Sequence, residues 1–153
     1  MRYIIAITMV LSFPASACGF PASELSLGGV EIGETETHVV ELLGPPNTRV
    51  DTGEGTELRY PGLVFTVGWL EQAAPGVERR VFASRAEAHS ACTPMGLCPG
   101  MSVAQATKLY GPTDPTVRET GTFLEYQPVG EQCWLQVHAP TDTILSLAVA
   151  CQP

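Results

Sequence analysis

The chain has few charged residues, and very few of them are positive. Charged residues make up 16% of its 153 positions, with 8 Lys or Arg against 16 Asp or Glu, and the formal net charge is −8. Lys108 is the single lysine. A surface that binds nucleic acid needs clustered Lys and Arg, so we expect no nucleic-acid partner. Acidity of this kind favours solubility and does not select a partner.

No apolar run is long enough to cross a membrane. Residues 3–13 form the most apolar run near the start, and it is too short for a bilayer core of about 30 Å. Arg2 precedes this run, Pro14 ends it, and residues 15–17 have the small-x-small pattern of a cleavage site. These features are typical of an export signal. We therefore predict that residues 1–17 are a signal peptide.

The common catalytic and cofactor motifs are also missing. The sequence has no phosphate-binding loop, no dinucleotide fingerprint and no nucleophile elbow. His38, His89 and His138 are scattered and share no ligand spacing. We accordingly predict no catalytic residue, no metal site and no cofactor.

One acidic loop could be mistaken for a site. Residues 51–53 spell Asp-Thr-Gly, the triplet of aspartic proteases, but residues 119–121 repeat it as Glu-Thr-Gly. We interpret both as turns between a helix and a strand. Asp51, Glu54 and Glu57 could also hold a weak calcium ion, but the loop lacks the alternation of an EF-hand. A solvated acidic turn is the favoured interpretation.

Five cysteines are present: Cys18, Cys92, Cys98, Cys133 and Cys151. An odd number in an exported protein leaves one unpaired. Cys18 directly follows the expected cleavage site, which resembles the bacterial lipoprotein signal, although Ala15 stands where that signal prefers Leu. Two alternatives stay open: Cys18 is acylated, or ordinary cleavage leaves it as a bare N-terminal residue. Lipidation at Cys18 would let the other four cysteines pair completely.

The last two cysteines can be paired from strand register. Residues 140–143, Pro-Thr-Asp-Thr, have the composition of a hairpin loop. Folding the chain about Asp142 places Cys133 opposite Cys151. The same register sets three further apolar pairs on that face, and a slip of one residue would destroy them. They are Leu135 with Val149, Val137 with Leu147, and Ala139 with Leu145.

Cys92 and Cys98 remain, and they bracket Thr-Pro-Met-Gly-Leu. Pro94 and Gly96 make a turn tight enough to join the two sulfurs. In the chain-entropy model this loop stabilises by about 2.4 kcal/mol and the hairpin crosslink by about 3 kcal/mol. The alternative of a metal or redox site is disfavoured because no Cys-x-x-Cys or Cys/His pair occurs.

The richest signal is an internal repeat. Residues 33–45 recur sixty-seven positions later as residues 100–112, with the Gly, Thr/Ser, Leu and Gly-Pro positions kept. Each copy predicts a short helix, capped by Thr35 or Ser102 and ended by Gly44 or Gly111. Strands are expected near residues 56–60, 63–70 and 77–84 in the first copy, and near 122–127, 132–139 and 144–151 in the second.

These elements predict an α+β fold of two tandem units. Each unit is a short helix plus a three-stranded antiparallel meander, with the helices packed on one sheet face. The expected division is a signal peptide (1–17), an N-terminal tether (18–30), repeat unit 1 (31–84), a disulfide-bearing connector (85–99) and repeat unit 2 (100–153). The alternation of Leu63, Phe65, Val67 and Trp69 predicts that one face of this strand is buried.

Trp134 is the candidate partner-binding residue. The hairpin register places it on the sheet face away from the core, beside Ala148 and Ala150. An exposed Trp there could anchor a partner. The alternative is that a loop or the other unit covers it.

The repeated pattern Gly-x-Thr/Ser, an apolar position, and Leu-Leu/Tyr-Gly-Pro resembles the small outer-membrane lipoproteins of the barrel-assembly machinery and the secreted β-lactamase-inhibitor protein. The resemblance implies helices packed on an antiparallel sheet, and the inhibitor has two such units. It implies a non-catalytic exported envelope protein. We expect a periplasmic lipoprotein that binds another envelope or secreted protein and meets the membrane only through a lipid on Cys18. The alternative is a secreted inhibitor of a hydrolase such as a β-lactamase.

Overall fold

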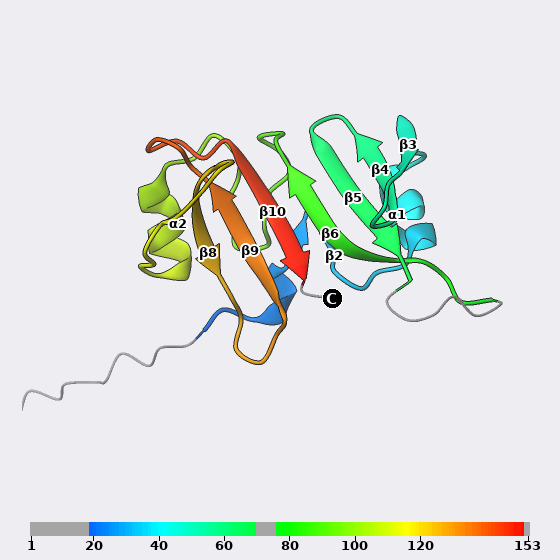
Figure 1. Cartoon of the computed structure of the whole chain (residues 1–153), viewed down its shortest axis with the longest axis horizontal. Coiled ribbons are helices and arrows are strands. Elements are labelled where there is room, and N and C mark those ends of the chain that lie inside the picture. The colour runs from blue at the N-terminus through cyan, green and yellow to red at the C-terminus, as the bar shows by residue number, and fades with distance from the viewer. Residues whose placement is uncertain (1–18, 70–75, 152–153) are drawn as a thin grey trace, which may run out of the picture.

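The computed structural model describes residues 19–69 and 76–151, and the expected signal peptide and Cys18 lie outside them. Within the described residues the protein is mostly β and has two α-helices, labelled α1 and α2 in Figure 1. The elements are, in order, a 3-10 turn Ala22–Glu24, β1 Ser26–Leu27, β2 Val30–Glu31, α1 Glu36–Leu43, β3 Thr48–Asp51, β4 Thr56–Tyr60, β5 Leu63–Gly68, β6 Arg80–Ala86, α2 Val103–Tyr110, β7 Thr116–Arg118, β8 Gly121–Tyr126, β9 Cys133–His138 and β10 Ser146–Cys151.

The predicted fold class is wrong. Eight strands form one antiparallel sheet in the order β3-β4-β5-β6-β10-β9-β8-β7, and four strands, not three, follow each helix. The sheet is continuous because β6 pairs with β10 along four residue pairs, from Ala83–Ala150 to Ala86–Leu147. These eight strands therefore share one sheet and one core and are not two helix-plus-meander units placed in tandem; β1 and β2 form a separate two-stranded sheet.

Both helices begin and end where the sequence predicts. Thr35 caps α1 by accepting a hydrogen bond from the backbone N–H of His38. Ser102 and Gln105 form a reciprocal capping box at the start of α2. Gly44 and Gly111 end the helices with φ of 81° and 92°, a conformation that side chains with a Cβ rarely adopt.

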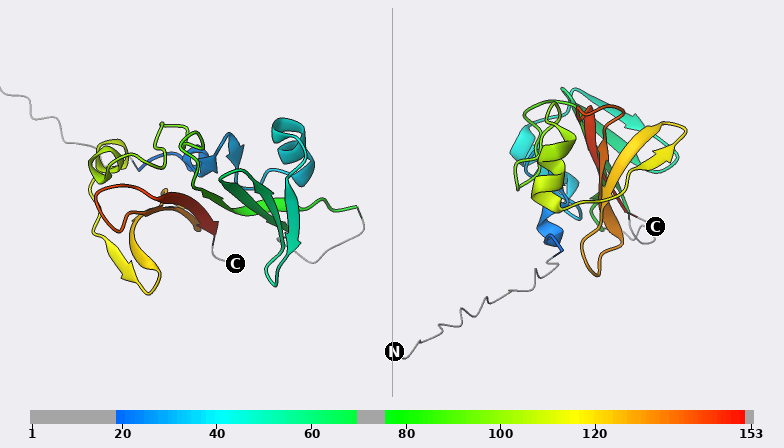
Figure 2. Two further views of the ribbon diagram at one scale, coloured as in Figure 1. Left: turned by 90° about the horizontal axis from the view of Figure 1, so that it is seen from above. Right: turned by 90° about the vertical axis from the view of Figure 1, so that its left-hand side faces the viewer.

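The core lies between the sheet and the layer that carries the helices. It is built from alternate residues of the strands, including Leu58, Phe65, Leu135 and Leu147, all fully buried. Residues 24–30, part of the expected tether, also contribute Leu25, Leu27 and Val30 to this core. Figure 2 shows this N-terminal segment between the two helices on the same side of the sheet.

The final hairpin has the register that the cysteines predict. Cys133 is paired with Cys151 in the ladder, followed by Leu135–Val149 and Val137–Leu147. Disulfides join Cys133 to Cys151 and Cys92 to Cys98. The expected pair Ala139–Leu145 is wrong, because the ladder ends at Ser146 and Leu145 is 53% exposed.

Two apolar positions are more exposed than expected. The register between β5 and β6 shifts after Thr66, and the chain then leaves the sheet at Trp69, which is 51% exposed. Leu42, an apolar residue of α1, is also half exposed, at 50%, whereas Val39 of the same helix is fully buried. Within the described residues, no helix is long and apolar enough to cross a membrane.

Candidate functional site

The most distinctive surface is the sheet face opposite the helices, which we call the open face. Seen from above in Figure 2, the helices and residues 19–32 lie on one side of the sheet, and the hairpins β3–β4 and β7–β8 curl toward the other. The sheet is therefore concave on its open face. No helix in the described part of the chain lies there.

Rows of cross-strand neighbours define the open face. One row runs Val64, Arg85, Ala148, Gln136 and Glu125 across β5, β6, β10, β9 and β8. The next runs Thr66, Ala83, Ala150 and Trp134. Because side chains alternate along a strand, these rows lie opposite the core residues between them.

The floor of the open face is low at its centre. The central strands β6 and β10 carry alanines there, Ala83, Ala148 and Ala150, all only partly exposed. Two hollows result: one of about 210 Å³ that includes all three alanines, and one of about 350 Å³ beside Phe123, Gln136 and His138. Ala148 and Arg85 line both hollows, so they lie where the two meet.

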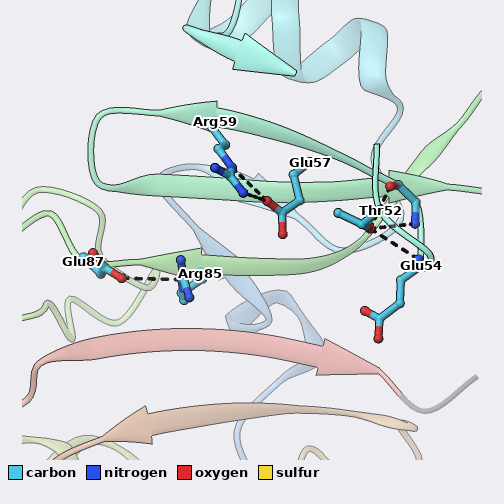
Figure 3. A network of polar contacts seen from close by, with 7 residues as sticks. Thr52, Glu54, Glu57, Arg59, Arg85 and Glu87 are labelled. Atoms are coloured by element: carbon cyan, nitrogen blue, oxygen red, sulfur yellow. Dashed lines mark hydrogen bonds and ion pairs between the residues drawn. The ribbon is translucent and has the colours of Figure 1, made fainter. Parts of the chain in front are cut away.

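Charged side chains surround these hollows as opposite pairs. Arg59 makes two hydrogen bonds to Glu57, of 2.8 and 2.6 Å. Arg118 bonds to Glu125, which also accepts a hydrogen bond from Gln136 at 2.9 Å. Figure 3 shows the first pair on β4 and the looser Arg85–Glu87 pair at β6, at 3.5 Å.

Trp134 lies on the open face but is not freely exposed. It is opposite Ala150 in the ladder, and its side chain is partly buried. Its Nε1 atom is buried and has no hydrogen-bond partner among the described residues. Trp134 therefore forms part of the wall of the open face and is not a protruding anchor.

The acidic loop is a local turn, as interpreted, but it joins two strands, β3 and β4, and not a helix and a strand. The Thr52 hydroxyl donates to the carbonyl of Gly55 and accepts from the backbone N–H groups of Glu54 and Gly55 (Figure 3). Asp51 accepts from the Thr56 hydroxyl at 2.8 Å. Within residues 19–69 and 76–151, no three His, Cys, Asp or Glu side chains are placed to hold a metal ion.

The three histidines lie in different surroundings. The Nε2 atom of His38, on the first helix, is 3.6 Å from the Oε1 atom of Glu34, which precedes that helix. His89 lies beside Gly100. His138 stacks on Phe123, with ring centroids 4.8 Å apart. Ser146 is the cross-strand neighbour of His138, but no hydrogen bond among the described residues joins them. The described residues therefore form no Ser-His-acid arrangement.

A second polar cluster lies on the helix side, where residues 19–32 meet the Cys92–Cys98 loop. Glu24 is buried and accepts hydrogen bonds from the Tyr110 hydroxyl at 2.8 Å and the backbone N–H of Met95 at 3.0 Å. Thr93 also bonds to the Tyr110 hydroxyl, at 2.6 Å. The cluster fastens the N-terminal segment to the second half of the molecule, which is a structural role.

This cluster predicts a loss of stability in alkali. Burial raises the pKa of the Tyr110 hydroxyl well above its usual value of 10.0, and Glu24 adds to the rise. An unfolded tyrosine ionises near pH 10 and the folded one does not. The contribution of the Tyr110 hydroxyl to the free energy of unfolding is therefore fully present below about pH 10, and it is lost as the pH rises through the raised pKa. Denaturant unfolding from pH 8 to 11 measures this effect. At pH 8 the free energy of unfolding of Tyr110→Phe should be about 1–3 kcal/mol lower than that of the wild type. Between pH 8 and 11 it should fall less steeply with pH than that of the wild type. If the free energy of unfolding falls equally steeply with pH in the variant and the wild type, the loss of stability in alkali does not come from Tyr110.

A further hollow, of about 430 Å³, lies beside the first helix. The Glu36 carboxylate bonds to Arg79 at 2.7 Å and to Arg49, and Arg79 lies 5.8 Å from the ring centroid of Trp69. The Trp69 N–H donates to the carbonyl of Val77. These contacts fix the helix to β3 and to the segment just before β6, and that segment also holds Trp69.

No family model matches the chain, and no curated protein sequence matches it. Two solved structures are similar. One is an extracellular protein containing a SCP domain from Bacillus anthracis, at 12% identity and a TM-score of 0.55, with 99% of this chain and 50% of that chain covered. The other is a cysteine-rich secretory protein from Staphylococcus aureus, at 8% identity and a TM-score of 0.58, with 89% of this chain and 48% of that chain covered.

These comparisons show a shared fold. This chain spans about half the length of each of the two structures. The resemblance expected from the sequence is wrong, because neither structure is a barrel-assembly lipoprotein or a β-lactamase inhibitor. Its motif was made of helix caps and turns, which recur wherever a short helix precedes a strand.

The hairpin register placed Trp134, Ala148 and Ala150 together on this face, but the sequence did not predict the part of the open face that β6 contributes. Arg85 was assigned to the connector, and Ala83 to the end of a strand. The missed signal was alternation: Ala83 and Arg85 face one way, and the buried Ser84 and Ala86 face the other. That pattern indicates a strand with one buried face, but it does not indicate what the exposed face binds.

Proposed function

We propose that this is an exported, non-catalytic protein that binds another protein through its open face. The observation that carries the proposal is a concave, helix-free sheet face with two hollows and an alanine floor, ringed by charged pairs. Such a surface offers a recessed apolar centre and a polar rim, the usual arrangement of a protein interface.

Several features support export. The N-terminal segment has the pattern of a signal peptide. Two disulfides are present, and disulfides persist mainly in oxidising compartments. The two structures of similar fold carry the words "extracellular" and "secretory" in their descriptions.

The absence of catalysis is supported by the chemistry of the open face. Its Arg59 and Arg118 side chains are held by carboxylates of the same face. His138 is stacked on Phe123 and makes no hydrogen bond to its neighbour Ser146 among the described residues. A nucleophile activated by a base and an orienting acid requires such bonds.

Filling the floor should abolish partner binding. Ala148→Arg adds a long side chain where the two hollows meet, and Ala104→Arg makes the same change at an exposed position of α2. A photo-crosslinking amino acid at position 148 should capture one partner, which mass spectrometry identifies, and the same group at 104 should not. Affinity of the purified partner should fall at least tenfold for Ala148→Arg, equal to about 1.4 kcal/mol.

The control Ala104→Arg should change this affinity less than twofold, and both variants should melt like the wild type. Equal capture at positions 104 and 148, or full affinity of the Ala148→Arg protein, would place the interface elsewhere.

We also propose that the protein is held at a periplasmic membrane surface by a lipid on Cys18, because lipidation leaves four cysteines that pair completely. Intact mass of the membrane-extracted protein should show a chain that begins at Cys18 with an added acyl mass. Cys18→Ala should release it to the soluble fraction. A soluble wild-type protein with an unmodified Cys18 would refute the lipid anchor.

A further inference from the structure

Arg85 lies at the centre of the open face and extends from β6. Its cross-strand neighbours there are Val64 and Ala148, which are too short to cover a guanidinium group. The Arg85 side chain is 60% exposed, and it lines both hollows. A partner seated on the open face would therefore contact Arg85 from both sides.

Arg85 is the least neutralised arginine of this face. Arg59 is held by two short hydrogen bonds to Glu57, and Arg118 by a bond to Glu125. Arg85 meets Glu87 only at 3.5 Å through Nε, and Glu87 is itself 60% exposed. The Arg85 side chain makes no hydrogen bond within residues 19–69 and 76–151, so both of its terminal nitrogens can bind a partner.

A partner that covers the open face would make this weakly paired guanidinium selective for what it binds. A charged group removed from water without a counter-charge is strongly destabilising. A partner that fills the hollows must therefore supply acceptors for Arg85. The planar guanidinium presents its N–H groups as a fork that matches the two oxygens of a carboxylate.

The preference for a carboxylate is confined to the surroundings of Arg85 and does not extend over the whole surface. The three arginine–glutamate pairs described above, Arg59–Glu57, Arg85–Glu87 and Arg118–Glu125, are neutral as a group. The whole chain has a net charge of −8, and an acidic group would be repelled by most of the remaining surface. Of these three arginines, Arg85 is the one that an acidic side chain can bind without breaking an existing side-chain hydrogen bond.

Resting on the proposed function, we propose that the protein partner inserts an Asp or Glu side chain between the two hollows and pairs it with Arg85. The adjoining apolar residues of the partner then fill the hollows over Ala148, on either side of that carboxylate. Arg85 is thus the specificity-determining residue of the interface.

Two capped pentapeptides provide a defined probe: acetyl-Gly-Phe-Glu-Phe-Gly amide and its Gln counterpart. Titration is followed by the Nε–Hε resonance of Arg85 and the backbone amide of Ala148. We expect saturable shifts, with the Glu peptide bound at least fivefold more tightly than the Gln peptide. Arg85→Gln should abolish this preference, and Arg85→Lys, which keeps the charge but loses the fork, should reduce it.

Arg59→Gln is the matched control, because it removes a paired arginine of the same face and should leave the preference intact. Equal affinity for the two peptides, no saturable binding, or a preference that survives Arg85→Gln would overturn the proposal. So would tighter binding of inorganic phosphate than of the Glu peptide, or self-association of the wild type that Arg85→Gln abolishes.

The same variants separate this proposal from the one it rests on. If Ala148→Arg abolishes binding of the crosslinked partner and Arg85→Gln leaves it unchanged, the open face is the interface but the carboxylate is not its anchor. If neither changes binding, the proposed function itself fails.

Discussion

Replacing Leu147 by alanine is expected to lower the free energy of unfolding by about 2–5 kcal/mol. Leu147 is fully buried. It lies in β10 between Ala86 of β6 and Val137 of β9, where the two halves of the sheet meet. The substitution leaves a cavity in the one core that both halves share. Denaturant unfolding of the purified protein measures the change.

Leu145→Ala is the matched control, because the same side chain two residues earlier is 53% exposed. It should change stability by no more than about 0.5 kcal/mol. Both proteins should unfold in one cooperative transition, as expected for a single core. Two separate transitions, with Leu147→Ala affecting only the second, would contradict the continuous sheet.

Removal of the hairpin disulfide should have a comparable effect. Cys133→Ser is expected to destabilise by about 2–5 kcal/mol and to leave Cys151 as a reactive thiol. The Cys92–Cys98 bond closes a shorter loop, with a separation of 6 residues against 18, so its removal should cost less. Thiol labelling and denaturant unfolding of the two variants measure both effects.

Digestion without reduction checks the pairing itself. It should yield one peptide pair that joins the final strands and one short loop closed internally. A crosslink from Cys92 or Cys98 to the final hairpin would show that the register is wrong.

The sequence predicts the local structure well where two independent constraints agree. The pairing of β9 with β10 follows because the two cysteines and the apolar alternation demand the same register. The caps Thr35 and Ser102 follow because only certain residues satisfy the free N–H groups at a helix start. Each of these constraints acts over a few residues.

The missed elements lack such constraints. Strands β3 and β7 lie at the two edges of the sheet, and their residues are mostly exposed, so neither shows an apolar alternation. The pairing of β6 with β10 joins residues such as Ala86 and Leu147, far apart in the chain, and no local pattern specifies it. Trp69 was misplaced because a shift in register is invisible in the sequence.

The candidate site was less predictable than the fold. Trp134 attracts attention because of its size, but the open face depends on small residues and on one weakly paired arginine. Whether Arg85 has a firm counter-charge depends on side-chain distances across three strands, and spacing along the chain does not encode them.

The pairing of β6 with β10 also affects the order in which the parts of the chain can fold. One edge of β6 pairs with β5, and the other pairs with β10, which follows it in the chain only after α2, β7, β8 and β9. During synthesis and export, this second edge of β6 remains unpaired until β10 is available, and such an edge readily pairs with other chains. Closing it requires a contact between distant segments, which forms slowly. A chaperone that shields the β6 edge would therefore act on the nascent chain, before the open face has formed.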